Sequence, residues 1–135
     1  MNLVDSSGWI EYFQDSGRAD LFAPAIEQRA GLLVPVIALF EVHKVLSRHI
    51  PPEAVQECIN VMRLGRVLEI TDKRAVAAAD AALQHRLAMA DAMMYSLALE
   101  FNATFWTQDV DYEGLPGVRY FAKPSKAGAG GGAAD

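Results

Sequence analysis

The chain has 135 residues, enough for one domain with a buried core, and its apolar runs are far too short to span a bilayer, which takes ~20 apolar residues. Its net charge of −5 does not indicate a nucleic-acid binder, although acids gathered around a metal would leave the rest nearly neutral. The lone cysteine, Cys58, cannot form an internal disulfide, and the first residues do not resemble a signal peptide, so we expect a cytoplasmic protein without membrane contact.

Short apolar runs alternate with helical patterns along the chain. The first run, residues 2–4, predicts a central strand, and Ser6 or Ser7 can cap a helix over residues 9–13. Pro24 suggests that the next helix begins late, with the proline in its first turn. The remaining pattern predicts strands over residues 32–34, 67–70, 104–106 and 118–121, and helices over residues 19–30, 35–49, 52–64, 73–86 and 91–101.

This alternation predicts an α/β fold in a single domain over residues 1–122. We expect a central, mostly parallel sheet of four to five short strands with helices on both faces, and the last strand at an edge. Residues 123–135 are rich in glycine and alanine and have no apolar anchor, so we expect a disordered tail there.

Acidic residues directly follow two of the predicted strands. Asp5 comes after residues 2–4, and Asp109 and Asp111 come after residues 104–106. Sites in parallel α/β sheets form beyond the carboxyl ends of the strands, and Mg²⁺ prefers oxygen ligands. The sequence therefore indicates a cation site at this edge, although Asp5 could instead serve only as the N-cap of the next helix.

Two further acids lie at positions where a carboxylate is unusual or needs a stabilising partner. Glu41 falls between Phe40 and Val42 in an apolar helical stripe, and Asp91 opens the helix that leads into the strand at residues 104–106. A salt bridge could explain Glu41, and the helix dipole could explain Asp91. Four acids brought together would repel one another unless a divalent cation, Mg²⁺ or Mn²⁺, held them.

Four motifs in this order resemble PIN-domain proteins, most closely the VapC-type toxins of toxin–antitoxin pairs. They are Val4-Asp5-Ser6-Ser7, residues 38–42 around Glu41, Asp91-Ala92, and residues 107–112, and the resemblance covers residues 3–121. It implies a metal-dependent endoribonuclease that works as a homodimer and is inhibited by a cognate antitoxin. Its catalytic residues would be Asp5, Glu41, Asp91 and Asp109.

The same resemblance distributes roles among the site residues. Asp5, Asp91 and Asp109 would bind the metal, and Glu41 would orient or deprotonate the attacking water. The residues expected to support the site are Ser6, Thr107 and Asp111. The candidates for contacts with RNA phosphates, each of which could also be ordinary surface charge, are Arg18, Lys44, Arg48 and Arg86.

Two other classes of function stay open at this point. A receiver-like signalling domain would also bind Mg²⁺, and Asp72 could be its phosphoacceptor, but the paired acids expected after the first strand are missing because Asp5 stands alone. A PIN fold that has lost its activity could serve as a scaffold, and the four intact acids argue against that reading.

Overall fold

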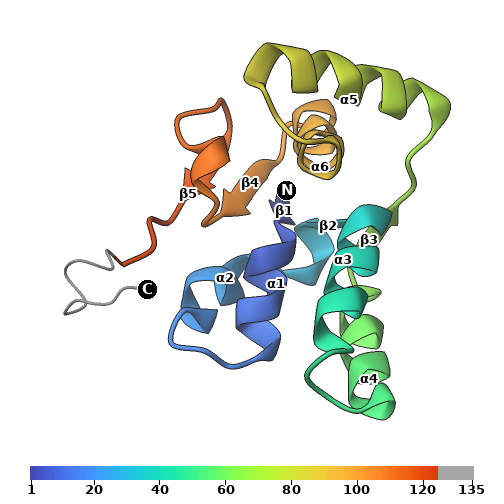
Figure 1. Cartoon of the computed structure of the whole chain (residues 1–135), viewed down its shortest axis with the longest axis vertical. Coiled ribbons are helices and arrows are strands. Elements are labelled where there is room, and N and C mark those ends of the chain that lie inside the picture. Colours follow the sequence, from blue (N-terminus) through green and yellow to red (C-terminus); the bar gives the residue numbers. More distant parts are fainter. Residues whose placement is uncertain (125–135) are drawn as a thin grey trace.

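The computed structural model describes residues 1–124, so the predicted disordered tail lies outside the described residues from residue 125 onward. Five parallel strands form one sheet in the order β3-β2-β1-β4-β5 (Figure 1). They are β1 (Asn2–Val4), β2 (Leu32–Pro35), β3 (Arg66–Leu68), β4 (Thr104–Thr107) and β5 (Val118–Tyr120). The predicted α/β fold with a parallel sheet is confirmed, and β5 lies at the expected edge.

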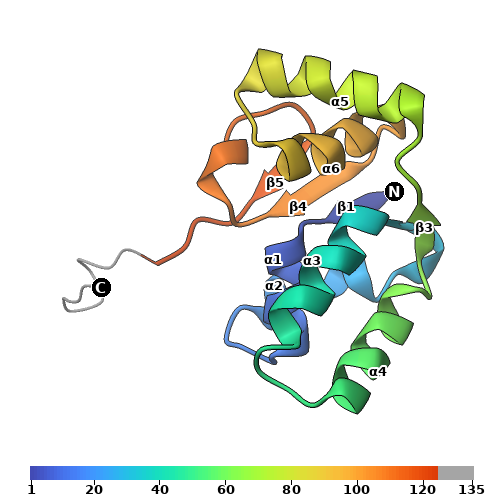
Figure 2. The same cartoon turned by 45° about the vertical axis from the view of Figure 1, so that its right-hand side comes forward.

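Helices connect the strands and cover both sides of the sheet. Figure 2 shows α5 and α6 packed together on one side, with α1 and α2 on the other. The helices are α1 (Ser6–Phe13), α2 (Ala19–Ile26), α3 (Val36–Leu46), α4 (Pro52–Met62), α5 (Asp72–His85) and α6 (Met89–Glu100), with short 3-10 helices η1 (Arg29–Gly31) and η2 (Val110–Tyr112). Every helix within residues 1–124 is too short or too polar to cross a membrane.

The strand order reverses at the middle of the sheet, between β1 and β4. From β1 the chain moves outward to β2 and β3, and it then returns to β4 on the other side of β1. Connections therefore leave the neighbouring strands β1 and β4 in opposite directions, which opens a crevice beyond their carboxyl ends. Val4 and Trp106 are paired at this end of the two strands.

The core explains why the central strands are wholly apolar. Leu3 and Val4 of β1 are completely buried, because β1 has a strand on each side and helices on each face. Gly8 lets α1 approach α2 closely, since a Cβ there would lie 2.6 Å from the Phe22 ring and 2.8 Å from Val4 Cγ1. A glycine at position 8 is thus required by the packing of α1 against β1 and α2.

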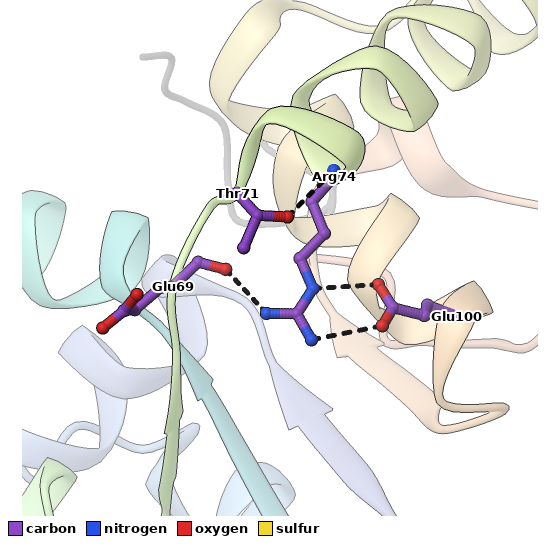
Figure 3. Close-up of polar contacts among 4 residues, drawn as sticks. All are labelled: Glu69, Thr71, Arg74 and Glu100. Atoms are coloured by element: carbon purple, nitrogen blue, oxygen red, sulfur yellow. Dashed lines mark hydrogen bonds and ion pairs between the residues drawn. The ribbon is translucent and has the colours of Figure 1, made fainter.

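Helix α5 is fastened to its neighbours by Arg74 (Figure 3). Its guanidinium binds both carboxylate oxygens of Glu100 on α6, at 3.0 and 3.1 Å, and donates to the main-chain oxygen of Glu69 at 2.8 Å. The guanidinium also lies 5.5 Å from the centre of the Phe101 ring. The Thr71 hydroxyl caps the same helix end by accepting from the Arg74 main-chain N–H.

Three local predictions were wrong. Helix α1 begins at Ser6, and its cap is Asp5 rather than Ser6 or Ser7, because the Asp5 carboxylate accepts the first free N–H itself. Helix α2 begins at Ala19 with Pro24 in its interior; it ends at Ile26, soon after the proline removes a donor, and η1 follows. Phe40, expected on the apolar face of α3, is 64% exposed.

Candidate active site

An open cavity of about 640 Å³ lies beyond the carboxyl ends of β1 and β4. It is lined by four acids that are far apart in the sequence: Asp5, Glu41, Asp91 and Asp109. They come from the end of β1, the middle of α3, the first turn of α6 and the residues after β4. The structure thus brings together all four acids that the sequence singles out as catalytic.

Asp5 forms the floor of this site and is 4% exposed. Its Oδ1 accepts from the Ser6 main-chain N–H at 2.7 Å, and its Oδ2 accepts from the Thr107 hydroxyl at 2.8 Å. Its own N–H donates to the Trp106 main-chain oxygen at 2.9 Å, which continues the pairing of β1 with β4. The same carboxylate is therefore a helix cap and a member of the acidic group, so the two interpretations of Asp5 do not exclude each other.

Thr107 connects the two strand ends. Its hydroxyl donates to Asp5 and accepts from the Asp109 main-chain N–H at 2.9 Å. Asp109 Oδ1 in turn accepts from the Asp111 main-chain N–H at 2.9 Å and caps η2. Because a hydroxyl can donate and accept at once, one buried side chain connects the Asp5 carboxylate to the main chain of Asp109.

Glu41 has a hydroxyl rather than a cation as its partner. The Ser6 hydroxyl donates to Glu41 Oε1 at 2.6 Å, and within residues 1–124 the one side-chain ion pair joins Arg74 and Glu100. The salt bridge considered for Glu41 is therefore not seen in the part of the chain that the structure describes. Its other oxygen has no hydrogen-bond partner there, and Glu41 lines the cavity.

Asp91 is held at the cavity by the start of α6. Tyr112, which is completely buried, donates its hydroxyl to the main-chain oxygen of Asp91 at 3.2 Å. Burial raises the pKa of the Tyr112 phenol far above its ordinary value, so the hydroxyl remains a donor. Tyr112 therefore ties the segment after β4 to the first turn of α6.

Three carboxylates are close enough to share one cation. Single oxygens of Asp91, Asp109 and Asp111 all lie within 4.8 Å of one another. This set includes Asp111 and leaves out Asp5, whose two oxygens already accept hydrogen bonds. A cluster of hard oxygen donors without an ion-paired lysine or arginine in the described residues suits a divalent cation such as Mg²⁺ or Mn²⁺.

The electrostatics of the site also favour a cation. Burial raises the pKa of Asp5 to about 7, against the lowering effect of its hydrogen bonds from Thr107 and Ser6. Burial likewise raises the pKa of Asp91, and the carboxylates of Asp109 and Glu41 raise it further. Without a cation, ionising these groups together costs free energy, and a divalent ion would remove that cost.

Of the four basic residues predicted to contact RNA, Lys44 lines the cavity. Arg18 instead donates to Gln108 Oε1 at 2.7 Å and to the Phe121 main-chain oxygen at 3.1 Å, which holds the segment after β5 in place. Arg48 follows α3 and Arg86 caps the end of α5 in a left-handed conformation, with φ 57°. Neither is among the residues that line the cavity.

Sequence reasoning missed several residues of the site. Gln108, 4% exposed, joins Arg18 to Glu11, to which its amide donates at 2.8 Å. Its place between Thr107 and Asp109 inside a recognised motif was a usable signal, as was the position of Tyr112 at the end of that motif. Lys123 lines the cavity after a segment that Arg18 contacts at the Phe121 main-chain oxygen, and nothing local in the sequence indicates this.

Solved structures share this fold at low sequence identity. A toxin–antitoxin complex from Klebsiella pneumoniae aligns with a TM-score of 0.75 and 18% identity, over 88% of this chain and 96% of the other. VapBC2 from Rickettsia felis, bound to a promoter DNA fragment, gives 0.69 and 12%, over 89% and 96%. VapC20 from Mycobacterium tuberculosis, a toxin that cleaves the sarcin–ricin loop, gives 0.67 and 14%, over 84% and 92%.

The sequence itself shows the family. No curated protein matches the chain, but the family model for the PIN domain matches residues 3–117. The matched stretch contains the four acids that line the cavity. The resemblance to PIN-domain proteins is confirmed, and this chain belongs to the PIN domain family.

Proposed function

We propose that this protein is the toxin of a toxin–antitoxin pair and acts as a Mg²⁺-dependent endoribonuclease. The observation that carries the proposal is the convergence of Asp5, Glu41, Asp91 and Asp109 on one cavity in a PIN domain. The fold is shared with proteins from toxin–antitoxin complexes, one of which is described as a toxin that cleaves the sarcin–ricin loop. RNA as the substrate is therefore part of the proposal.

Asp91, Asp109 and Asp111 would hold the metal, and Asp5 would join them directly or through water. A bound Mg²⁺, or Mn²⁺ in its place, makes coordinated water more acidic and stabilises negative charge on a phosphoryl oxygen. The Thr107 hydroxyl, which donates to the Asp5 carboxylate and accepts from the Asp109 main-chain N–H, orients both residues without a cation. The protein thus presents its ligands from fixed positions.

Glu41 is the residue best placed to accept a proton. Ser6 holds Oε1, which leaves Oε2 without a partner in the described residues and available to a water molecule in the cavity. As the oxygen of that water forms a bond to phosphorus, Glu41 would take the proton of the water. The ribose oxygen would leave with the electron pair of the broken bond and take a proton from solvent. Ser6 is therefore a positioning residue for Glu41.

The cognate antitoxin, a homodimer and a cytoplasmic location belong to the same proposal. The dimer is supported by an exposed apolar surface on α5 and the start of α6, where Val76, Leu83 and Met89 are 66%, 82% and 73% exposed. They lie along helices rich in alanine, which can pack closely against a second helix pair. An antitoxin would act by covering the acidic cavity.

The proposal is tested by RNA cleavage. Purified wild type should cleave single-stranded RNA with Mg²⁺ and stop when EDTA is added, and Asp5→Asn should lower the rate about 100-fold or more. Asp80→Asn, an equivalent change on the exposed side of α5, is the matched control and should cleave like wild type. Cleavage that survives Asp5→Asn would refute the site, and cleavage in EDTA would refute the role of the metal.

The structure supports the receiver-like signalling domain and the inactive scaffold less well than it supports a nuclease. Asp72, the phosphoacceptor that a receiver domain would need, is exposed at the start of α5 and does not line the acidic cavity. The chain is moreover a PIN domain. An inactive scaffold would not need the hydrogen bonds that hold Asp5, Asp109 and Glu41 toward one cavity.

A further inference from the structure

An aromatic side chain is open to solvent at the rim of the acidic cavity. Phe40 directly precedes Glu41 on α3, lines the same cavity and is 64% exposed. Among the phenylalanine, tyrosine and tryptophan side chains of residues 1–124 it is the one that is exposed. The buried face of α3 is formed by Ala38, Val42 and Leu46, so the core does not require an aromatic ring at position 40.

Two cations share the rim with this ring. Lys44 lies one helical turn after Phe40, with its Nζ 5.6 Å from the ring centre, and it lines the cavity. Lys123 reaches the same cavity from the segment after β5, which Arg18 anchors. Neither lysine is ion-paired within the described part of the chain, so both ammonium groups are available to a ligand.

A second apolar group stands beside another of the acids. Val110 directly follows Asp109, is 62% exposed and lines the cavity. The acidic centre is thus bordered by exposed apolar surface next to Glu41 and next to Asp109, and Lys44 and Lys123 line the same cavity. Aromatic rings next to cations are what proteins use to bind single-stranded nucleic acid, since bases stack on the ring and phosphates contact the cations.

We propose that Phe40 is a stacking platform for an unpaired base of the RNA substrate, and that Lys44 and Lys123 contact the phosphates beside that base. This inference rests on the proposed function and adds binding residues to it: Phe40 for a base that is free on at least one face, and Lys44 and Lys123 for the phosphates. In a duplex both faces of an internal base are stacked, so Phe40 would find no partner. An apolar peptide would match the exposed ring but not the two unpaired lysines.

The test measures RNA binding rather than cleavage. Fluorescence anisotropy in EDTA would measure the binding of a labelled single-stranded RNA of about 12 nucleotides and of the same RNA as a duplex. A further set of single strands would each lack one base, at a different position in each strand. Phe40→Ala should weaken single-strand binding about 5- to 100-fold, and Phe40→Trp should restore it. Leu64→Ala, at an apolar site 54% exposed and away from both the acidic cavity and the α5 surface, is the matched control and should bind like wild type.

The abasic set shows whether the ring meets a base. At the position where base removal weakens wild-type binding most, Phe40→Ala should cause no additional loss, because both changes remove one contact. Lys44→Gln should lower the slope of log K against log salt by about 0.7, since one phosphate contact is lost.

Several results would overturn the inference. Wild type that cleaves RNA, with Phe40→Ala binding single strands within twofold of it, would refute the stacking role and leave the proposed function standing. A Phe40→Ala protein that binds RNA normally but changes its oligomeric state would identify Phe40 as a protein contact. Wild type that neither binds nor cleaves RNA would overturn the proposed function itself.

Discussion

At the scale of single residues, the candidate site is built from side chains that also hold the fold together. Asp5 ends β1, caps α1 and faces the cavity, and Thr107 orients both Asp5 and Asp109. The sequence could indicate Asp5 because an acid after a buried apolar run is unusual. It could not show that Asp111 joins Asp91 and Asp109 in one close group of carboxylates, because that depends on how separate segments pack.

The buried Asp5 should make the stability of the metal-free protein fall as pH rises. Its pKa is about 7 in the folded protein against an ordinary 3.8, so its contribution is fully present below about pH 4 and is lost as pH approaches 7. In EDTA the free energy of unfolding should drop by about 2 to 4 kcal/mol across this window. Urea denaturation at several pH values should show a flatter profile for Asp5→Asn, and parallel profiles would contradict a buried carboxylate with a raised pKa.

Replacing Thr107 with valine should harm both stability and activity. The change leaves Asp5 Oδ2 and the Asp109 N–H without their partner in a buried place, at a cost of about 2 kcal/mol. Cleavage should fall about tenfold or more because the Asp5 carboxylate and the Asp109 main chain lose the group that orients them. Thr107→Ser keeps the hydroxyl and should retain most of both; a valine variant as active as the serine variant would show that the hydroxyl positions nothing.

At the scale of helices and strands, the hydrophobic periodicity predicted the order of the elements but not which side chains of each helix face the core. The alternation of apolar runs and helical patterns indicated five strands and the helices between them. It could not show that Phe40 points outward, since an aromatic residue fits an apolar stripe equally well. Nor could it show that Arg18 is committed to Gln108 and Phe121, because those contacts join segments about a hundred residues apart.

Arg74 is expected to fasten α5 to α6 without affecting the chemistry. Its side chain is 22% exposed and binds Glu100 through both oxygens, so Arg74→Met should cost about 1 kcal/mol, more than a typical surface pair. Urea unfolding should show a lower midpoint with an unchanged slope. Arg74→Lys cannot form the paired contact and should recover only part of the loss; full recovery would mean that the paired geometry contributes nothing. Cleavage should stay at the wild-type level in both variants.

At the scale of the whole molecule, the strand order explains why distant acids meet. The chain reverses its direction across the sheet between β1 and β4, and the crevice opened there receives Asp5, Asp109, Asp91 and Glu41 from four separate segments. A net charge of −5 is compatible with a polyanionic substrate when part of it is concentrated where a cation binds. The alternation of strands and helices predicted this edge, whereas the rim formed by Phe40 and Lys123 required the folded chain.

The most direct test is a titration of Mn²⁺ followed by electron paramagnetic resonance, in which bound ion is measured without RNA. Wild type should bind Mn²⁺ and release it when Mg²⁺ is added in excess. Asp91→Asn, Asp109→Asn and Asp111→Asn should each weaken binding about tenfold or more, while Asp80→Asn should bind as wild type does. Wild type that binds no ion, or variants that bind it as tightly as wild type, would show that these acids do not form one cation site.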